Sequence, residues 1–380
     1  MRILVVASYS PSLINFREQL LRSLVSKSHQ VWAAAPFPSE QLWVESKLSE
    51  IGVVPLSWNL ARQALNPLLD IQSFAQLVFF YLRFRPELVL AYTVKPVIYS
   101  GLLCRTCTLL RPRSRFRFLA LITGLGYAFT DGQRTTKRRF LHKVLSRLFK
   151  IALSASDVVA FQNPDDQAEF EHMSLVPNSA KLIRVWGSGV DLTLFPHRQL
   201  PKRPVFLMLS RLLADKGVRE YVNAARIIKK QFPFSVFRLA GMLDPNPAAI
   251  SREELEEWIA EGVIEYLGDL HSVQTALAAC RFYVLPSYRE GTPRSVLEAM
   301  ATGRPILTTD APGCRETVID GVNGFLVPPR DSEALANAML RLIEQPESET
   351  QRMAQASLEL ARERFDVHKV NAQLLEAMGA

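Results

Sequence analysis

The sequence predicts an α/β protein with two doubly wound domains, each a parallel sheet covered by helices. Short apolar stretches alternate with longer amphipathic ones, and this alternation starts twice, at Met1 and again at Pro204. The 380 residues are enough to build two separate cores. Between the two patterns lies a segment rich in Pro, Gly and basic residues, which is typical of a linker.

These observations set the expected domain boundaries. We expect a first domain over residues 1–187, a linker over 188–203 and a second domain over 204–362. A final helix is expected over about 350–378, and its end, about 363–380, is expected to pack back on the first domain.

The first domain is expected to place ligand-binding loops after its strands. Strands are expected over 1–7, 29–35, 87–91, 118–122 and 157–162, and helices over 16–24, 68–84, from 97 onward and over 134–155. Small residues around Ser10 leave room for a ligand above the sheet, and Lys95 stands where a parallel strand ends. Gly124 and Gly126 allow a ligand to approach the backbone closely. A solvated lysine is the alternative interpretation of Lys95.

The second domain repeats the alternation. Strands are expected over 204–209, 235–240, 263–267, 281–285, 305–309 and 325–327, and helices over 218–231, 272–280 and 333–342. Arg211 and Lys216 follow the first of these strands, five residues apart. The planar guanidinium of an arginine can donate two hydrogen bonds to phosphate oxygens, and the compact ammonium of a lysine adds a second positive charge. Together they suit the binding of a diphosphate. No D-x-D motif of the kind used by metal-dependent transferases lies nearby, so we expect no metal site.

The stretch from Glu290 to Glu298 carries the strongest signal. Gly291 permits a tight turn, Pro293 suits the first helical position, and Thr292 and Ser295 add hydroxyl groups. A helix start of this kind favours anions because free N–H groups and the positive end of the dipole meet there. With a carboxylate on each side, the stretch suits a ligand with phosphate in the middle and hydroxyls at both ends, such as a nucleotide sugar. A solvated strand–helix junction with two surface glutamates is the alternative.

Charge is distributed unevenly along the chain. The net charge is +8, and residues 105–150 contain twelve Lys and Arg against a single acid, Asp131. Within them the helix expected over 134–155 pairs an apolar stripe with a cationic face that includes Arg138, Arg139 and Lys143. This pattern favours an anionic membrane surface over a merely solvated face. Nucleic acid is a poorer fit, because no recognition motif or interleaved exposed aromatics accompany the charge.

The chain is expected to be cytoplasmic. No window reaches the roughly 18 uninterrupted apolar residues of a membrane span, and the short apolar start at Met1 is expected to be a first strand rather than a signal peptide. Cys104 and Cys107 form a C-x-x-C without a second pair or a histidine cluster, so small core residues are expected there rather than zinc ligands.

The run EGTPRSVLEAMATGRPIL, followed by GVNGFLVPPRD, resembles the retaining nucleotide-sugar transferases of glycosyltransferase family 4. The resemblance implies the GT-B fold, in which two Rossmann-like domains face a central cleft, and it implies no cofactor beyond the donor substrate. It also implies that Arg211 and Lys216 hold the donor diphosphate and that Glu290 binds sugar hydroxyls. Further donor contacts implied by the motif are Gly241, Gly291, Thr292, Ser295, Val296, Leu297 and Glu298, the last of these at the ribose hydroxyls.

Other features resemble a bacterial subgroup that extends undecaprenyl-diphosphate-linked sugars. The loop Tyr92–Pro96 lacks the histidine that many family members carry, and the segments 64–67 and 97–101 are similar to those of the subgroup. The resemblance implies a UDP-linked N-acetylhexosamine such as N-acetylgalactosamine as donor. The implied acceptor is a polyprenyl-diphosphate-linked saccharide, with Ser10, Lys95 and Gly124 as candidate contacts, at the inner face of the cytoplasmic membrane. A hexosyltransferase with another lipid or a soluble acceptor, and a sugar-nucleotide epimerase of the same fold, are the alternatives.

Overall fold

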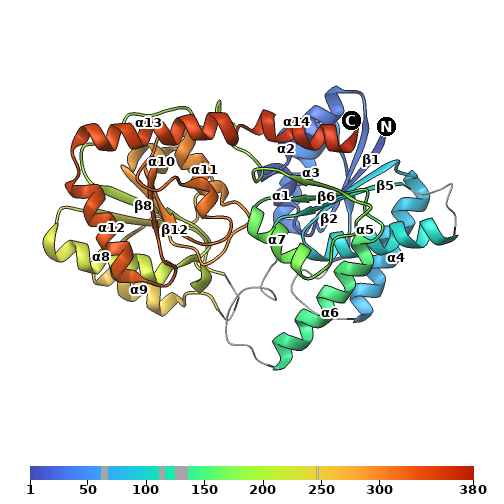
Figure 1. Ribbon diagram of the computed structural model, residues 1–380, viewed down its shortest axis with the longest axis horizontal. Coiled ribbons are helices and arrows are strands. Elements are labelled where there is room, and N and C mark those ends of the chain that lie inside the picture. Colours follow the sequence, from blue (N-terminus) through green and yellow to red (C-terminus); the bar gives the residue numbers. More distant parts are fainter. Residues whose placement is uncertain (61–66, 111–115, 125–135, 245, 247) are drawn as a thin grey trace. The chain divides into compact units, whose positions relative to one another are not determined.

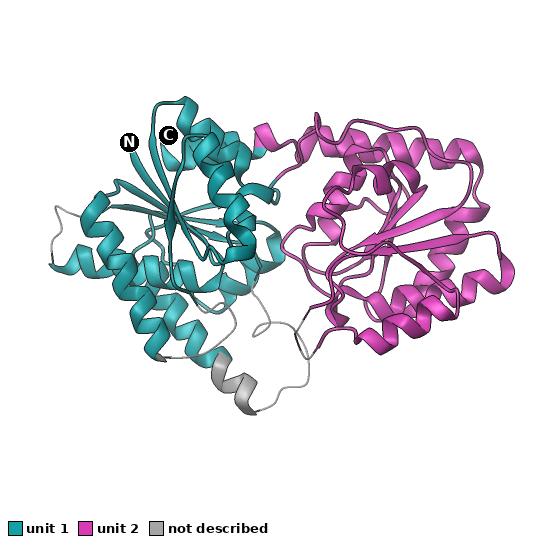
Figure 2. Cartoon of the chain, turned by 180° about the vertical axis from the view of Figure 1, so that it is seen from behind, with its two compact units in different colours: residues 1–188, 370–380 teal, residues 189–369 magenta. Residues whose placement is uncertain are grey.

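The computed structural model divides the chain into two compact units (Figure 2). The first unit comprises Met1–Ser188 together with Val370–Ala380, and the second comprises Gly189–Lys369. The structure describes residues 1–60, 67–110, 116–124, 136–244, 246 and 248–380, without the side chains of residues 67 and 136–141. Residues 64–66 of the segment that resembles the subgroup, Gly126, and the side chains of Arg138 and Arg139 lie outside the described residues.

The described residues of the first unit form a seven-stranded parallel sheet in the order β3-β2-β1-β4-β5-β6-β7 (Figure 1). Its strands are β1 (Arg2–Val6), β2 (Gln30–Ala35), β3 (Val54–Ser57), β4 (Leu88–Tyr92), β5 (Arg117–Ile122), β6 (Val158–Phe161) and β7 (Lys181–Arg184). The direction of strand addition reverses between β1 and β4. Loops leaving these two neighbours diverge to opposite faces, which opens a crevice at their carboxyl ends where ligands of α/β sheets bind.

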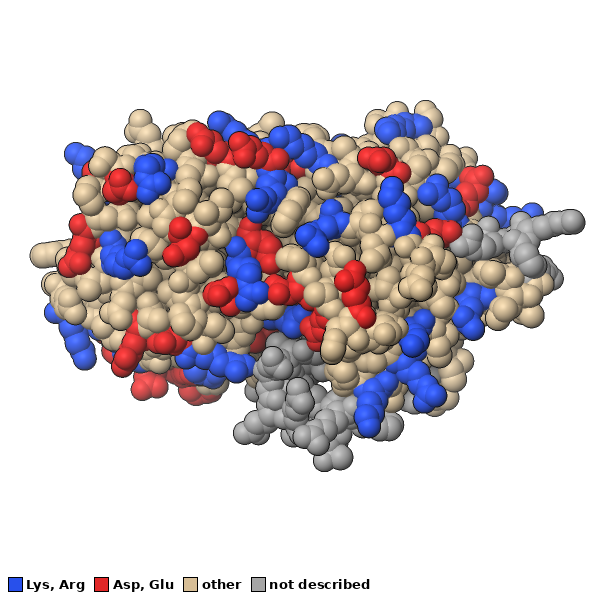
Figure 3. Space-filling view, viewed as in Figure 1, with Lys and Arg blue, Asp and Glu red and all other residues tan. Residues whose placement is uncertain are grey.

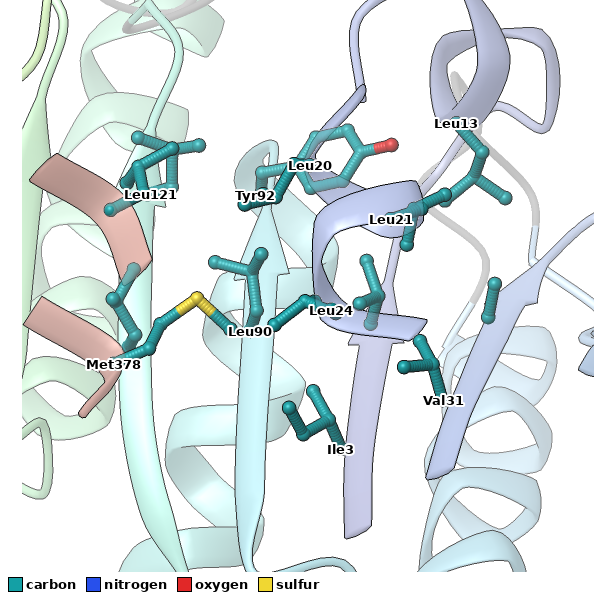
Figure 4. Close-up of a cluster of buried hydrophobic side chains, with 14 of the residues drawn as sticks. Ile3, Leu13, Leu20, Leu21, Leu24, Val31, Leu90, Tyr92, Leu121 and Met378 are labelled. Atoms are coloured by element: carbon teal, nitrogen blue, oxygen red, sulfur yellow. The ribbon is translucent and has the colours of Figure 1, made fainter. Parts of the chain in front are cut away.

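Helices cover both faces of this sheet. One face carries α4 (Pro67–Phe84), α5 (Val94–Leu110), α6 (Thr136–Leu153) and α7 (Pro164–His172). The other face carries α1 (Pro11–Asn15), α2 (Glu18–Ser26), α3 (Leu42–Glu50) and the end of α14 (Val367–Met378). In Figure 4, Met378 of α14 points toward Leu90 of β4 in the same apolar cluster as Leu24. Arg117 donates to the Met378 carbonyl oxygen at 2.7 Å and so holds the end of α14 on the first unit.

The second unit has a six-stranded parallel sheet among its described residues, in the order β10-β9-β8-β11-β12-β13. The strands are β8 (Val205–Leu209), β9 (Val236–Ala240), β10 (Glu265–Tyr266), β11 (Phe282–Leu285), β12 (Ile306–Thr309) and β13 (Gly324–Val327). One face carries α8 (Val218–Gln231), α9 (Arg252–Ala260) and α12 (Ser332–Glu344), and the other α10 (Gln274–Ala279), α11 (Arg294–Ala301) and α13 (Glu347–Arg364) (Figure 1). Here the reversal lies between β8 and β11, the strands that precede the two motifs.

The segment expected as a linker is bound to the second unit. Arg304 is fully buried and donates to the carbonyl oxygens of Arg198, Gln199 and Cys280. Arg281 donates to the carbonyl oxygen of Pro201 at 2.7 Å. A buried guanidinium satisfies backbone acceptors that would otherwise lose their hydrogen bonds to water. These bonds fasten residues 198–201 to the core that carries β11.

Several elements differ from the expectation. The final helix is interrupted at Phe365 and Asp366, because the backbone there pairs with Val190. The N–H of Val190 donates to the Phe365 carbonyl oxygen, and the N–H of Val367 donates to the Val190 carbonyl oxygen. The strands β3 and β7 and the helices α1, α3 and α9 were not predicted. Helix α5 begins at Val94 rather than Val97, so Lys95 lies in its first turn instead of in a loop.

None of the described helices is both long and apolar enough to cross a membrane.

Gly101 provides a test of how α5 and α6 pack. A Cβ at Gly101 would lie 2.5 Å from the Ala152 carbonyl oxygen of α6, so the two helix backbones meet there without room for a side chain. We expect Gly101→Ala to lower the free energy of unfolding by about 1–3 kcal/mol, because the helices must move apart. Chemical denaturation measures the change. Thr106→Ala, at an exposed position of the same helix, should change stability by less than about 0.5 kcal/mol. An unchanged unfolding midpoint for Gly101→Ala would contradict this packing.

Candidate active site

Lys216 and Glu290 meet where β8 and β11 end. Lys216 closes a short 3₁₀ turn (Ala214–Lys216) after β8, and Glu290 follows β11 by five residues. The Lys216 Nζ donates to Glu290 Oε1 at 2.5 Å, and the Ser287 hydroxyl donates to the same oxygen at 2.8 Å. Both charged side chains are largely buried, with 15% of Lys216 and 17% of Glu290 exposed. The two residues predicted for diphosphate and sugar binding therefore form one ion pair.

The surroundings of Lys216 keep its side chain protonated. Burial by itself lowers the pKa of Lys216, but the Glu290 carboxylate, helped by Asp215, outweighs burial and raises the pKa above its usual value. Lys216 is therefore protonated at neutral pH, and its positive charge is available to an anionic ligand that displaces Glu290.

Close backbone approaches, made possible by glycine, bring these loops together. A Cβ at Gly217 would lie 2.2 Å from the Pro286 carbonyl oxygen, and one at Gly313 would lie 2.1 Å from the Glu290 carbonyl oxygen. Gly241, with φ of +141°, passes so close to Ser210 that a Cβ would lie 1.7 Å from the Ser210 carbonyl oxygen. No side chain fits at these three positions, so the loops after β8, β9, β11 and β12 can pack backbone against backbone.

Arg211 lies at the same edge of the sheet and is the more accessible cation. Its Nη1 donates to Asp244 Oδ2 at 2.9 Å, and 44% of its side chain is exposed, compared with 7% for Asp244. Asp244 also accepts a hydrogen bond from the Asn246 N–H, which fixes the carboxylate in its loop after β9. The guanidinium is thus held on one side by a buried carboxylate and presents its remaining surface to solvent.

The helix after the motif starts one residue later than predicted. Pro293 is the N-cap, and α11 begins at Arg294, so Glu298 lies little more than one turn into the helix. The N–H groups of Val296 and Leu297 donate to the Pro293 carbonyl oxygen. Ser295, another of the predicted donor contacts, precedes these bonds and lies at a position where an N–H has no acceptor within its own helix.

Hydroxyl and carboxyl groups in and just before α11 already have protein partners. The Ser295 hydroxyl donates to the Leu209 carbonyl oxygen at 3.2 Å, and the Thr292 hydroxyl to that of Gly291 at 2.9 Å. Glu298 accepts a hydrogen bond from Arg294 Nε at 2.7 Å, and 10% of its side chain is exposed. Burial raises the pKa of Glu298, and the Arg294 cation opposes that rise only in part.

The first unit has a corresponding set of polar residues where β1 and β4 end. Thr93 donates to the Ser8 hydroxyl at 2.8 Å, and Ser12 is hydrogen-bonded to the Tyr92 hydroxyl at 2.9 Å, so the two loops are tied together. Burial raises the pKa of Tyr92 to about 12, which keeps its hydroxyl protonated at neutral pH. The Arg17 guanidinium lies 5.4 Å from the centre of the Tyr92 ring.

The predicted acceptor residues differ in how accessible they are. Ser10 is fully buried, and its hydroxyl donates to Gln41 Oε1 at 2.6 Å, so it shapes the loop rather than presenting a free group. Lys95 donates to Asp70 Oδ1 at 2.7 Å and is 17% exposed. Gly124 ends the described part of its loop with φ of +114°.

Two residues of these sites were not predicted from the sequence. Asp70 is the partner of Lys95 and Asp244 is the partner of Arg211, and each lies 25 or more residues from its partner in the sequence.

The described residues contain no group of three or more His, Cys, Asp and Glu side chains that could hold a metal ion.

The chain is similar to known proteins in sequence and in fold. Residues 203–345 match the family model described as "Glycosyl transferases group 1". The whole fold is similar to sucrose-phosphate synthase from Thermosynechococcus elongatus, with a TM-score of 0.78, 19% identity and coverage of 99% of this chain and 98% of that one. It is also similar to Anabaena Alr3699/HepE in complex with UDP-glucose, with a TM-score of 0.74, 20% identity and coverage of 100% and 99%.

Fold and sequence similarity together define the class of protein. The chain is a glycosyltransferase with the GT-B fold, and it acts in the synthesis of polysaccharides or other glycans. Among curated proteins it is similar to the N,N'-diacetylbacillosaminyl-diphospho-undecaprenol alpha-1,3-N-acetylgalactosaminyltransferase of Campylobacter jejuni. The two are 26% identical over 358 residues, which span 90% of each chain. The predictions of a two-domain parallel α/β fold and of a glycosyltransferase are therefore confirmed.

The raised pKa of Glu298 predicts a specific pH dependence of stability. An unfolded glutamate titrates near pH 4.3, whereas folded Glu298 holds its proton to a higher pH. Between the two values the folded state binds more protons than the unfolded state, so stability falls as pH rises through this interval. Glu298→Gln cannot titrate and should abolish that part of the fall, measured by thermal unfolding from about pH 4 to 8. Glu257→Gln, at an exposed site on α9, should keep the wild-type profile. Identical profiles for Glu298→Gln and wild type would contradict the assignment.

Proposed function

We propose that the protein is a retaining glycosyltransferase that moves an N-acetylhexosamine, such as N-acetylgalactosamine, from a UDP-sugar to a polyprenyl-diphosphate-linked saccharide. The observation that carries the proposal is the Lys216–Glu290 ion pair at the ends of β8 and β11, with Arg211 at the same edge. The similarity to the Campylobacter jejuni transferase over 90% of both chains supports the donor sugar and the lipid-linked acceptor. The UDP-glucose complex of the Anabaena protein supports a uridine nucleotide.

Donor binding would rearrange the charges of the site. A diphosphate has more negative charge than the Glu290 carboxylate, so it would compete for Lys216, and the exposed guanidinium of Arg211 can take a second phosphate oxygen in a forked geometry. Glu290, still held by Ser287, would then be released to accept hydrogen bonds from hydroxyls of the donor sugar. Glu298 lies buried one turn into α11, at the end of the site where the ribose hydroxyls of the nucleotide would lie.

In the proposed reaction the bond from the anomeric carbon to the diphosphate oxygen breaks, and a bond from that carbon to an acceptor hydroxyl oxygen forms on the same face. The departing diphosphate oxygen takes the hydroxyl proton, and UDP leaves. Lys216 and Arg211 stabilise the negative charge that develops on the leaving group. No covalent intermediate on the protein is needed, and we assign no nucleophile.

The first unit supplies the proposed acceptor side. The hydrogen-bonded loops after β1 and β4 form its ligand edge, and Lys95 stands there with Asp70. Lys143, Arg147 and Lys150 are exposed on the described part of α6. In Figure 3 the surface over this part of α6 shows blue and tan atoms without red among the described residues. A cationic helix face of this kind would draw the protein to the anionic surface that holds a polyprenyl diphosphate, at the inner side of the cytoplasmic membrane.

The donor-site assignment predicts the effect of removing each cation. Arg211→Ala and Lys216→Ala should each reduce kcat/KM for transfer from UDP-N-acetylgalactosamine to a short-chain polyprenyl-diphosphate saccharide by about 30- to 1,000-fold, or about 2–4 kcal/mol. The measurement is the rate of product formation by the purified protein. Lys230→Ala removes an exposed cation at the far end of α8 and should leave the rate unchanged. Rates within about threefold of wild type in both site variants would contradict the proposal.

Metal removal gives a second test. Because Arg211, Lys216 and the start of α11 supply positive potential around the diphosphate, the rate of transfer should persist in excess EDTA. The control is the same assay with added magnesium or manganese, which should change the rate little. A rate that vanishes in EDTA and returns with either metal would show that the diphosphate is held differently.

A further inference from the structure

Helix α4 has an apolar face that points away from the protein. Its inner side is buried against the first unit's sheet through residues such as Leu77, Phe80 and Tyr81. At about 100° per residue, five other positions fall within an arc of about 80° on the outer side. We call these positions the α4 outer face, and they are Leu68, Ile71, Ala75, Phe79 and Leu82.

The α4 outer face is open to solvent. The exposed fractions are 79% for Leu68, 66% for Ile71 and 59% for both Phe79 and Leu82. At a rise of about 1.5 Å per residue, the face extends for about 21 Å along the helix. A surface helix normally turns polar residues outward, and a helix that is apolar all round is normally buried. An exposed apolar stripe of this length marks a surface that binds something.

The charges beside this face point to a lipid surface. Arg83 borders the stripe on α4, and Arg105 is exposed on α5, which packs between α4 and α6. Further exposed cations, Lys143, Arg147 and Lys150, lie on α6. The one acid within α4 is Asp70, and its carboxylate is neutralised by Lys95 at 2.7 Å. Apolar residues bordered by exposed cations match the acyl boundary and anionic headgroups of a bilayer.

We propose that the α4 outer face lies in the interfacial layer of an anionic bilayer, with the cations of α5 and α6 at the level of the headgroups. The proposal rests on the proposed function in that the acceptor is lipid-linked. Leu68 and Ile71 lie within two residues of Asp70 in the sequence, and Asp70 binds Lys95 at the ligand edge of the first unit. Seating this end of α4 in the membrane therefore brings the acceptor edge to the depth where a polyprenyl diphosphate presents its phosphates.

The test is co-sedimentation of the full chain with vesicles of phosphatidylcholine, with or without phosphatidylglycerol. The wild type should bind the phosphatidylglycerol vesicles, and Phe79→Gln/Leu82→Gln should reduce the partition coefficient by about tenfold or more, since two apolar side chains no longer leave water. The melting temperature should be unchanged, because both positions are exposed. Phe234→Gln/Leu194→Gln makes the same change at positions 80% and 53% exposed in the second unit and should bind as wild type.

A second variant separates charge from apolar contact. Lys143→Glu/Arg147→Glu should weaken vesicle binding at low salt, whereas the loss caused by Phe79→Gln/Leu82→Gln should persist at all salt concentrations. Undiminished vesicle binding by Phe79→Gln/Leu82→Gln would overturn the proposal. So would a wild-type dimer in light scattering that this variant converts to a monomer, because the face would then be a contact between two copies.

Activity distinguishes this proposal from the proposed function. Phe79→Gln/Leu82→Gln should keep the wild-type rate on a water-soluble short-chain acceptor and lose rate on the same saccharide embedded in vesicles. A wild type that binds vesicles but transfers no sugar to either acceptor would contradict the proposed function alone. Equal relative rates of wild type and variant on both acceptors would contradict the role of the α4 outer face alone.

Discussion

The ion pair between Lys216 and Glu290 is the central contact of the candidate active site. The two residues are 74 positions apart, and they meet because β8 and β11 are neighbours at the reversal of strand order. Gly217 and Gly313 allow their loops to pack backbone against backbone, so the separation of the two charges is set by the main chain. Both groups are mostly shielded from water, which strengthens their attraction and makes each costly to leave unpaired. A ligand that separates them must supply replacement partners, and a nucleotide sugar has both a diphosphate and hydroxyls.

The same topological constraint operates in the first unit with different chemistry. There the reversal lies between β1 and β4, and the loops that follow are joined by neutral hydroxyl contacts such as Thr93 to Ser8. The cation at this edge, Lys95, is paired with Asp70 from α4. One helix thus connects two features of the acceptor side, because α4 supplies the partner of Lys95 and also carries the exposed apolar face. Under the proposed function, the same helix would both position the acceptor group and seat the protein on a lipid surface.

The sequence was sufficient for features that depend on local pattern. The repeated strand–helix alternation predicted both sheets, and the turn chemistry from Glu290 to Pro293 predicted the start of α11 to within one residue. The sequence pattern did not predict features that depend on tertiary contacts. The edge strands β3 and β7 are short and only partly buried, so they lack a clear apolar period, and the break at Phe365 arises from pairing with Val190. Asp244 was missed because its proximity to Arg211 follows from strand order.

The measurement that tests the central claim most directly is calorimetric titration of the wild type with uridine, UMP and UDP in the absence of added metal. If a diphosphate takes Lys216 from Glu290, affinity should rise from uridine to UMP and again to UDP, and Lys216→Ala should remove most of the gain that the second phosphate provides. Affinities that are equal for UMP and UDP, or a gain for UDP that survives Lys216→Ala, would contradict the claim that this ion pair is the diphosphate site.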